Sequence, residues 1–261
     1  WAWKLVDFPE ATFQRNLAAL AWLLDQPEAR SERAFLTLTI QSGLLFSASI
    51  QHRNGSFDQA YPYEASYGAT AFLLPDLLDA YQAIKDSCAE MQQMAIEAML
   101  YRASAFLIKH AELHGTISNH LAGAALALRK AGGFFGRPDF TRKSGEILDY
   151  ILSKQSPEGW YVEYGGADPG YQTLCMYYLA QVYRLAEDEK EKEKLRASLA
   201  SSLDFLQYFI HPDGSFGGEY GSRRTEVYYP GGIALLSAEF PPAAAMSARM
   251  LASIEQGSTV T

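Results

Sequence analysis

The segment MQQMAIEAMLYRASAFLI, residues 91–108, indicates the fold class of this chain. Its apolar side chains recur at alternating intervals of three and four residues, which is the spacing of one face of an α-helix. The repeating positions are Met91, Met94, Ala98, Tyr101, Ala105 and Ile108. A second set with this spacing is Leu199, Leu203, Leu206 and Ile210. The two patterns predict an all-α protein.

Helical periodicity continues along nearly the whole chain. We expect ten helices, at about residues 10–25, 32–51, 67–84, 87–113, 119–131, 139–154, 169–186, 190–210, 229–238 and 241–255. The segment 32–51 is the least regular, because Leu36, Leu38 and Ile40 alternate as in a strand. Repeated helix pairs are typical of solenoids and α/α toroids. We therefore predict an (α/α) toroid of about five helical hairpins, either closed or an incomplete six-pair barrel, as a single domain over residues 1–261.

Composition and charge narrow the class of protein. The chain has 261 residues, of which 48% are hydrophobic, and a net charge of −8. Such an acidic chain is a poor nucleic-acid binder, because phosphate contacts need clustered Lys and Arg. No apolar run is long enough for a membrane span. The chain starts at Trp1 rather than Met, so we expect it to be trimmed from a longer protein. Both a cytoplasmic and a periplasmic location are compatible with the sequence.

Histidine and cysteine spacing gives no sign of a metal site or a cofactor. His110 and His114 are four residues apart, on one face of an expected helix, but no HExxH pattern surrounds them. Cys88 and Cys175 form no CxxC pair, and they are either buried thiols or a disulfide. We expect neither a metal nor a cofactor.

Four connections carry most of the unusual sequence, at residues 52–68, 115–120, 158–171 and 213–230. In an up-and-down helical array every second connection lies at the same end, so we expect all four on one face. Asn54-Gly55 and Asp213-Gly214 are typical of tight turns that need positive φ. Turn chemistry alone does not explain the aromatic, acidic and arginine residues that follow these turns.

Within these loops, several residues are candidates for chemistry beside a purely structural role. Asn119 and His120 open an expected helix, where Ser118 or Asn119 is also a good N-cap. In the third loop, Asp168 and Pro169 suit a helix start, whereas Glu163, Tyr164 and Tyr171 are not explained by capping, and Trp160 is either a sugar platform or a lid over the core. The last loop contains Glu219, Tyr220, Arg223, Arg224 and Glu226, which either bind an anion or form a network that pins the loop. His52 and Arg53, in the first loop, are further anion contacts.

These loops resemble those of the α/α-toroid domain in heparinase II/III-like polysaccharide lyases and their uncharacterised relatives, over roughly residues 30–235. The motifs are Gly55-Ser56-Phe57-Asp58 with Tyr61-Pro62, Ser118-Asn119-His120, Glu163-Tyr164-Gly165-Gly166 and Gly218-Glu219-Tyr220-Gly221-Ser222-Arg223. The resemblance implies a toroid that binds an oligo- or polysaccharide. Such lyases usually carry a following β-sandwich domain, which we expect to be missing from this chain.

The resemblance also implies a mechanism, the β-elimination of uronate-containing glycans. In it Asn119 polarises the uronate carboxyl with help from Arg223 or Arg224, and His120 or a tyrosine removes the C5 proton. Tyr171 or Tyr220 protonates the leaving oxygen. Two other interpretations fit the same residues. One is a glycoside hydrolase with paired carboxylates, drawn from Glu64, Glu163, Glu219 and Glu226. The other is a non-catalytic glycan-binding or scaffold module of surface-polysaccharide assembly.

Overall fold

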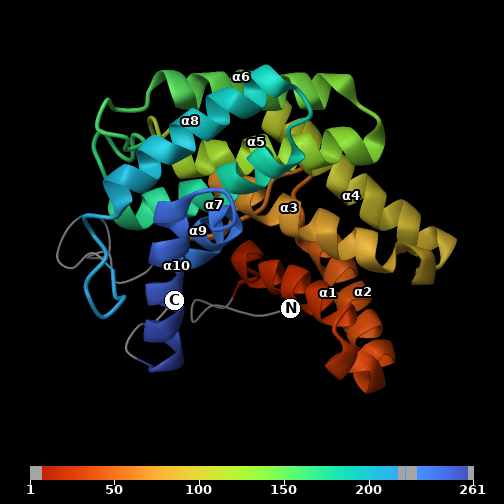
Figure 1. Cartoon of the computed structure of the whole chain (residues 1–261). Helices are drawn as coiled ribbons and strands as arrows, with labels where there is room; N and C mark the ends of the chain where they lie inside the picture. Colours follow the sequence, from red (N-terminus) through yellow and green to blue (C-terminus); the bar gives the residue numbers. More distant parts are fainter. Residues whose placement is uncertain (1–7, 217–220, 222–227, 258–261) are drawn as a thin grey trace. The chain divides into compact units, whose positions relative to one another are not determined.

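The protein is described here by a computed structural model covering residues 8–216, 221 and 228–257 (Figure 1). Within these ranges it contains ten α-helices and no extended strand, only isolated β-bridges. The helices are α1 (Asn16–Leu24), α2 (Arg33–Ile50), α3 (Tyr67–Ile84), α4 (Glu90–Lys109), α5 (Ser118–Phe135), α6 (Pro138–Ser153), α7 (Pro169–Leu185), α8 (Glu189–Leu206), α9 (Pro230–Leu236) and α10 (Pro241–Glu255). Each expected helix is present, and the all-α fold class is confirmed. The strand-like alternation is part of α2, which buries Leu36, Ile40 and Leu44 at helical spacing.

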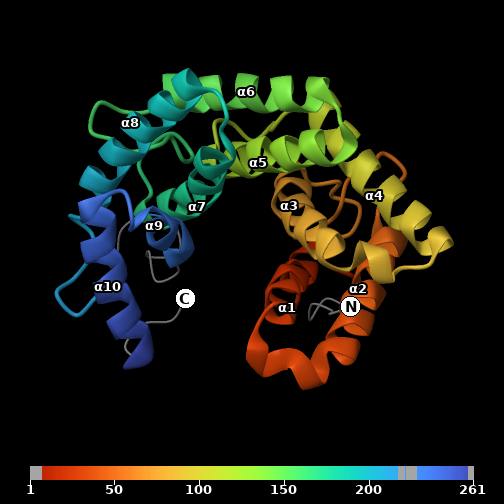
Figure 2. The ribbon, with the colours of Figure 1, turned by 45° about the vertical axis from the view of Figure 1, so that its right-hand side comes forward.

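The chain divides into two compact units. Unit 1 comprises Trp1–Ala111 and Ala127–Ser144, and unit 2 comprises Glu112–Leu126 and Gly145–Thr261. In unit 1, α3 packs against α1, α2 and α4, and α1 and α2 form a hairpin (Figure 2). In unit 2, α7 packs against α8 and α9, and α9 packs against α10. The central helices α3 and α7 are therefore buried along most of their length.

Helix α4 buries a different face from the one that its sequence predicts. Met91 and Met94 are 83% and 66% exposed. The buried stripe is formed by Ile96, Met99, Leu100, Ala103, Phe106 and Leu107. Residues 91–108 are apolar nearly all round, so two stripes fit the helical spacing, and the bulkier one packs inward. The helix also ends at Lys109, so His110 and His114 do not share a helical face as expected.

The glycine turns are structural. Gly55, Gly159 and Gly214 have φ of +96°, +97° and +84°, a conformation that side chains disfavour. Each glycine also touches the backbone of a neighbouring helix, where a Cβ atom would come within 2.0–2.1 Å of a carbonyl oxygen. The carbonyls are those of Arg102 in α4, Ser201 in α8 and Arg249 in α10. Each of these turns therefore packs against the second helix that follows it in the chain.

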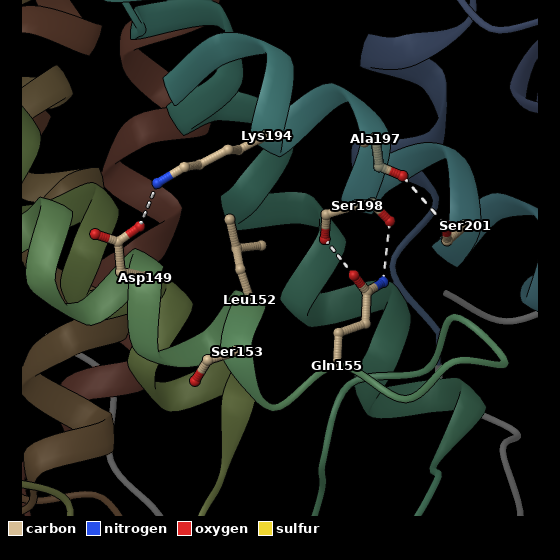
Figure 3. Close-up of a pocket in the computed structure, with 8 residues that line it drawn as sticks. All are labelled: Asp149, Leu152, Ser153, Gln155, Lys194, Ala197, Ser198 and Ser201. Atoms are coloured by element: carbon tan, nitrogen blue, oxygen red, sulfur yellow. Dashed lines mark hydrogen bonds and ion pairs between the residues drawn. The ribbon is translucent and has the colours of Figure 1, made fainter. Parts of the chain in front are cut away.

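At two of these three turns, a glutamine side chain adds hydrogen bonds to the contact with the neighbouring helix. Gln155 Nε2 donates to the carbonyl of Gly159. It also donates to the carbonyl of Ser198, and Ser198 Oγ donates back to Gln155 Oε1 (Figure 3). Gln51 Nε2 makes the matching bonds in unit 1, to the carbonyls of Gly55 and Met99. Both units therefore use the same combination of a glutamine and a glycine turn.

Candidate functional site

In unit 2 the second and third of the four loops meet. The backbone N–H of Ser118 donates to the carbonyl of Val162, and Ser118 Oγ donates to the same oxygen. Ile117 and Glu163 form a β-bridge. These bonds hold the first turn of α5 against the loop before α7. As a result, residues 44 positions apart in the sequence come into contact.

Asn119 is bonded to Glu163 through two hydrogen bonds. Its backbone N–H donates to Glu163 Oε1 at 2.8 Å, and its Nδ2 donates to Oε2 at 2.7 Å. Both residues are buried, with exposures of 1% and 3%. Asn119 Oδ1 is buried and has no hydrogen-bond partner. A buried unpaired acceptor costs about 1–3 kcal/mol, so it marks a place where a polar partner is favoured.

The carboxyl of Glu163 has an unusual protonation state. Burial raises its pKa to about 8, against the lowering effect of the two bonds from Asn119, and the neighbouring charge of Asp168 raises it further. Glu163 is therefore largely protonated at neutral pH.

The next residue, His120, is held by a different carboxylate. His120 Nδ1 lies 2.5 Å from Glu112 Oε2, and His114 Nδ1 lies 2.7 Å from Glu112 Oε1. Burial works to raise the pKa of Glu112, but bonds from His120 and His114 outweigh it and lower the pKa to about 2. Since an ionised carboxylate only accepts, each Nδ1 carries a proton. In the neutral ring of His120, Nε2 is then the basic nitrogen.

Two tyrosines stand beside these pairs. The rings of Tyr164 and Tyr171 lie 5.8 Å apart, and Tyr164 is 58% exposed with φ +52°. Burial raises the pKa of Tyr164, and so do Tyr171 and the carboxyls of Glu163 and Glu112. Tyr164 therefore keeps its proton and can act as a hydrogen donor.

The start of α7 fixes the position of Tyr171. As expected, Asp168 is the N-cap, and its Oδ1 accepts from the backbone N–H of Tyr171 at 3.0 Å. A Cβ atom at Gly221 would lie 3.0 Å from this carboxylate, so residue 221 of the last loop reaches the same helix start.

The other predicted residues belong to unit 1, make other contacts within unit 2, or lie outside the described ranges. In unit 1, His52 Nε2 lies 2.8 Å from Asp58 Oδ1, and Arg53 is exposed. Trp160, half-buried in unit 2, donates through Nε1 to Glu158. The residues outside the described ranges are Glu219, Tyr220, Arg223, Arg224 and Glu226. Sequence reasoning missed Glu112, because it placed this residue in the helix expected at about residues 87–113, whereas the helix ends at Lys109 and Glu112 lies in an irregular segment.

One pocket in unit 2 is lined by none of these residues. It has a volume of about 500 Å³ and lies between the end of α6 and α8 within unit 2 (Figure 3). Its lining includes Leu152, Gln155 and the ion pair of Lys194 with Asp149. Cys88 and Cys175 are both free and buried. In the described part of the chain no cluster of His, Cys, Asp and Glu could hold a metal ion, and no helix is long and apolar enough to cross a membrane.

Comparison with known proteins gives the family. No curated protein matches the sequence. A solved structure titled as a polysaccharide lyase is similar with a TM-score of 0.66 at 13% identity, over 94% of this chain and 76% of that chain, which supports the predicted all-α, toroid-type fold. The family model of the ulvan lyase N-terminal domain matches residues 28–234. The expected likeness to an all-helical polysaccharide lyase domain is therefore confirmed, and the chain belongs to the ulvan lyase N-terminal domain family.

Proposed function

We propose that the protein cleaves a uronate-containing polysaccharide by β-elimination, at the site formed in unit 2 by Asn119, His120, Tyr164 and Tyr171. One observation carries the proposal. The consecutive residues Asn119 and His120 are each held by their own buried carboxyl, Glu163 and Glu112. An oriented amide and an oriented imidazole next to each other match the two hardest tasks of the reaction.

The first task is to neutralise the uronate carboxylate, which makes the C5 proton more acidic. We assign this task to Asn119. When Glu163 is protonated, its O–H can donate to Asn119 Oδ1 once the amide has turned by about 180°. Both Nδ2 hydrogens then become available to the substrate carboxylate. The unpaired Oδ1 and the pKa of about 8 at Glu163 both favour this arrangement.

The second task is proton transfer. His120 takes the C5 proton on Nε2, because Glu112 holds its Nδ1–H and stabilises the imidazolium that forms. Tyr171, with Tyr164 beside it, donates a proton to the leaving O4. The C4–O4 bond breaks as the C4–C5 double bond forms. Arg223 and Arg224 supply additional positive charge for the carboxylate.

The contacts disfavour hydrolysis by paired carboxylates. Glu163 accepts both bonds from Asn119, and Glu112 binds two imidazoles. Glu64, in unit 1, accepts the backbone N–H groups of Gln59 and Ala60. None of the three presents an unengaged carboxyl to a glycosidic oxygen.

The test is a panel of polysaccharides that includes ulvan and other uronate-containing glycans. Ultraviolet absorbance and new reducing ends are measured together. Elimination gives both signals, hydrolysis gives reducing ends alone, and a binding module gives neither. We expect both signals, their loss in His120→Ala, and full activity in His110→Gln, whose ring bonds only the carbonyl of Phe106. Reducing ends without absorbance, or no product from any uronate glycan, would contradict the proposal.

A further inference from the structure

We infer that the first of the four loops contains a second glycan-binding site, formed in unit 1 by Tyr63 and His52. Its ligand is a pyranose ring of the polysaccharide, stacked on the face of Tyr63 with one hydroxyl bound to His52. The identity of that polysaccharide rests on the proposed function. The site gives a role to Tyr63, which belongs neither to the sequence motifs nor to the site in unit 2.

Tyr63 is held in a backbone conformation that a tyrosine disfavours. Its φ is +63°, and that of Ala65, two residues later, is +52°. Residues other than glycine are uncommon in this left-handed region, and the strain persists only where surrounding contacts enforce it. Folding gains little in return at Tyr63, because the residue is 88% exposed and buries almost no apolar area. The strain therefore serves something other than the core.

Two carboxylates enforce this conformation of the loop. Asp58 accepts the backbone N–H of Tyr63 through Oδ2 at 2.8 Å and that of Ala65 through Oδ1 at 2.9 Å. Glu64 Oε2 accepts the N–H groups of the two residues that follow Asp58, at 2.9 and 2.8 Å. These four bonds fix the loop before any ligand binds. An aromatic ring on a fixed loop loses little conformational entropy on binding, which favours affinity.

His52 supplies the polar contact beside the ring. The centroids of the His52 and Tyr63 rings lie 6.2 Å apart, with 41° between the ring planes. His52 Nε2 lies 2.8 Å from Asp58 Oδ1, and because a carboxylate accepts, Nε2 is the donor. In the neutral ring Nδ1 is then an acceptor, and it has no hydrogen-bond partner among the residues that the structure describes. An exposed aromatic face beside one oriented acceptor suits a sugar, whose C–H groups stack and whose hydroxyls donate.

Unit 2 presents a tyrosine in the same way. Tyr164 also has a positive φ, is 58% exposed, and precedes the N-cap of the central helix of its unit, as Tyr63 does. Both loops begin at the glutamine and glycine turn that the two units share. In the proposed function Tyr164 stands beside the reacting sugar. The equivalent place of Tyr63 therefore indicates contact with another sugar of the same polysaccharide.

The first experiment measures the binding of ulvan by isothermal titration calorimetry in a His120→Ala background, which prevents cleavage. We expect the affinity to fall roughly three- to tenfold in Tyr63→Ala, the effect of one lost aromatic contact. Tyr63→Phe keeps the ring face and should bind as the parent does. Tyr208→Ala is the matched control, since Tyr208 is 82% exposed without a positive φ. Unchanged affinity in Tyr63→Ala, or an equal loss in Tyr208→Ala, would overturn the inference.

A second measurement tests the strain without a ligand. Glycine adopts a positive φ freely, so Tyr63→Gly removes the strain and the ring together. We expect its melting temperature to lie about 2–4 °C above that of Tyr63→Ala, which keeps the strain, and not below that of the wild type. Its affinity for ulvan should be as low as that of Tyr63→Ala. A melting temperature below the wild-type value would show that the ring supports the fold, against the inference.

These results are distinguishable from the test of the lyase. Weaker binding by the Tyr63 variants of a protein that gives no ultraviolet product supports the second site and refutes the elimination. A protein that gives this product, and whose affinity is unchanged in Tyr63→Ala, lacks only the second site. A protein that binds no uronate-containing glycan contradicts both.

Discussion

At the scale of single residues, Glu163 and Glu112 have opposite protonation states near neutral pH, within one short stretch of structure. Burial raises the pKa of Glu163 to about 8, whereas two imidazoles bring that of Glu112 to about 2. Carboxyls whose environments separate their pKa values in this way commonly have different roles in catalysis. Here Glu163, as a neutral acid, binds the side-chain amide of Asn119, and Glu112, as an anion, binds the imidazole of His120.

Glu163→Gln tests the role of the neutral acid. A glutamine copies the protonated form, because its carbonyl accepts the Asn119 N–H and its amide donates to Asn119 Oδ1. We expect kcat near the wild-type value at pH 7. Above about pH 8 the wild type loses activity as Glu163 ionises, whereas the variant keeps it. The pH profile of kcat checks this, and a large loss at pH 7 would mean that an ionised Glu163 is required.

The same variant predicts a change in stability. The folded protein binds the Glu163 proton more tightly than the unfolded chain, whose pKa is near 4.5. The contribution of this group is therefore complete below pH 4.5 and is lost as the pH rises through about 8, at most about 5 kcal/mol. The free energy of unfolding of the wild type, relative to Glu163→Gln, should fall over this range. A constant difference between the two proteins would contradict the assignment.

Glu112→Gln tests the anion. A neutral amide cannot stabilise an imidazolium at His120, and its N–H₂ group competes with the two rings. We expect kcat to fall by roughly 10²–10⁴-fold with a small change in KM. Glu97→Gln is the control, since Glu97 is a half-buried glutamate that accepts a hydrogen bond from the phenol of Tyr81. Equal losses in both variants would indicate a general effect on folding.

At the scale of elements, the glycine turns fix how each hairpin docks. Gly159→Ala would place a methyl group 2.0 Å from the carbonyl of Ser201 in α8. We expect a loss of about 2–4 kcal/mol in the free energy of unfolding, from strain and overpacking together. Gly165→Ala is the matched control, because Gly165 has φ +93° but nothing within 4 Å. It should lose only about 1 kcal/mol. Denaturant unfolding of both variants measures the difference, and similar losses would show that backbone strain alone matters.

The elements are also where sequence and structure can be compared. Helical spacing predicted the helices, most of which contain a long periodic run, but it could not choose between two apolar stripes on α4. The sequence identified only some residues of the candidate site. Asn119, Glu163 and Tyr171 were identifiable because caps did not explain Glu163 or Tyr171, and Asn119 formed part of a family motif. Glu112 was not identifiable, since its contact with His120 depends on the path of an irregular segment after Lys109.

At the scale of the whole molecule, an acidic protein is proposed to bind an acidic glycan. The net charge of −8 sets the distant field, which salt screens within about 8–10 Å, so local cations decide binding at contact. Arg223→Ala should weaken the affinity for uronate oligosaccharides about tenfold, since a charge-assisted bond contributes about 1.5–3 kcal/mol. Affinity and melting temperature are measured on the same protein. A lower melting temperature with unchanged affinity would mean that Arg223 only pins its loop.

Gln51 bonds the turn at Gly55, and Gln155 bonds the turn at Gly159 in the same way. This repeated contact affects how relatives of the protein are recognised. These positions recur along the chain and stand out in the sequence, yet their role is to pack each glycine turn against a neighbouring helix. A search seeded with them will gather proteins that share the scaffold and differ in chemistry. A search for enzymes with this activity should instead require an Asn-His pair together with two separate glutamates, one upstream and one downstream of it.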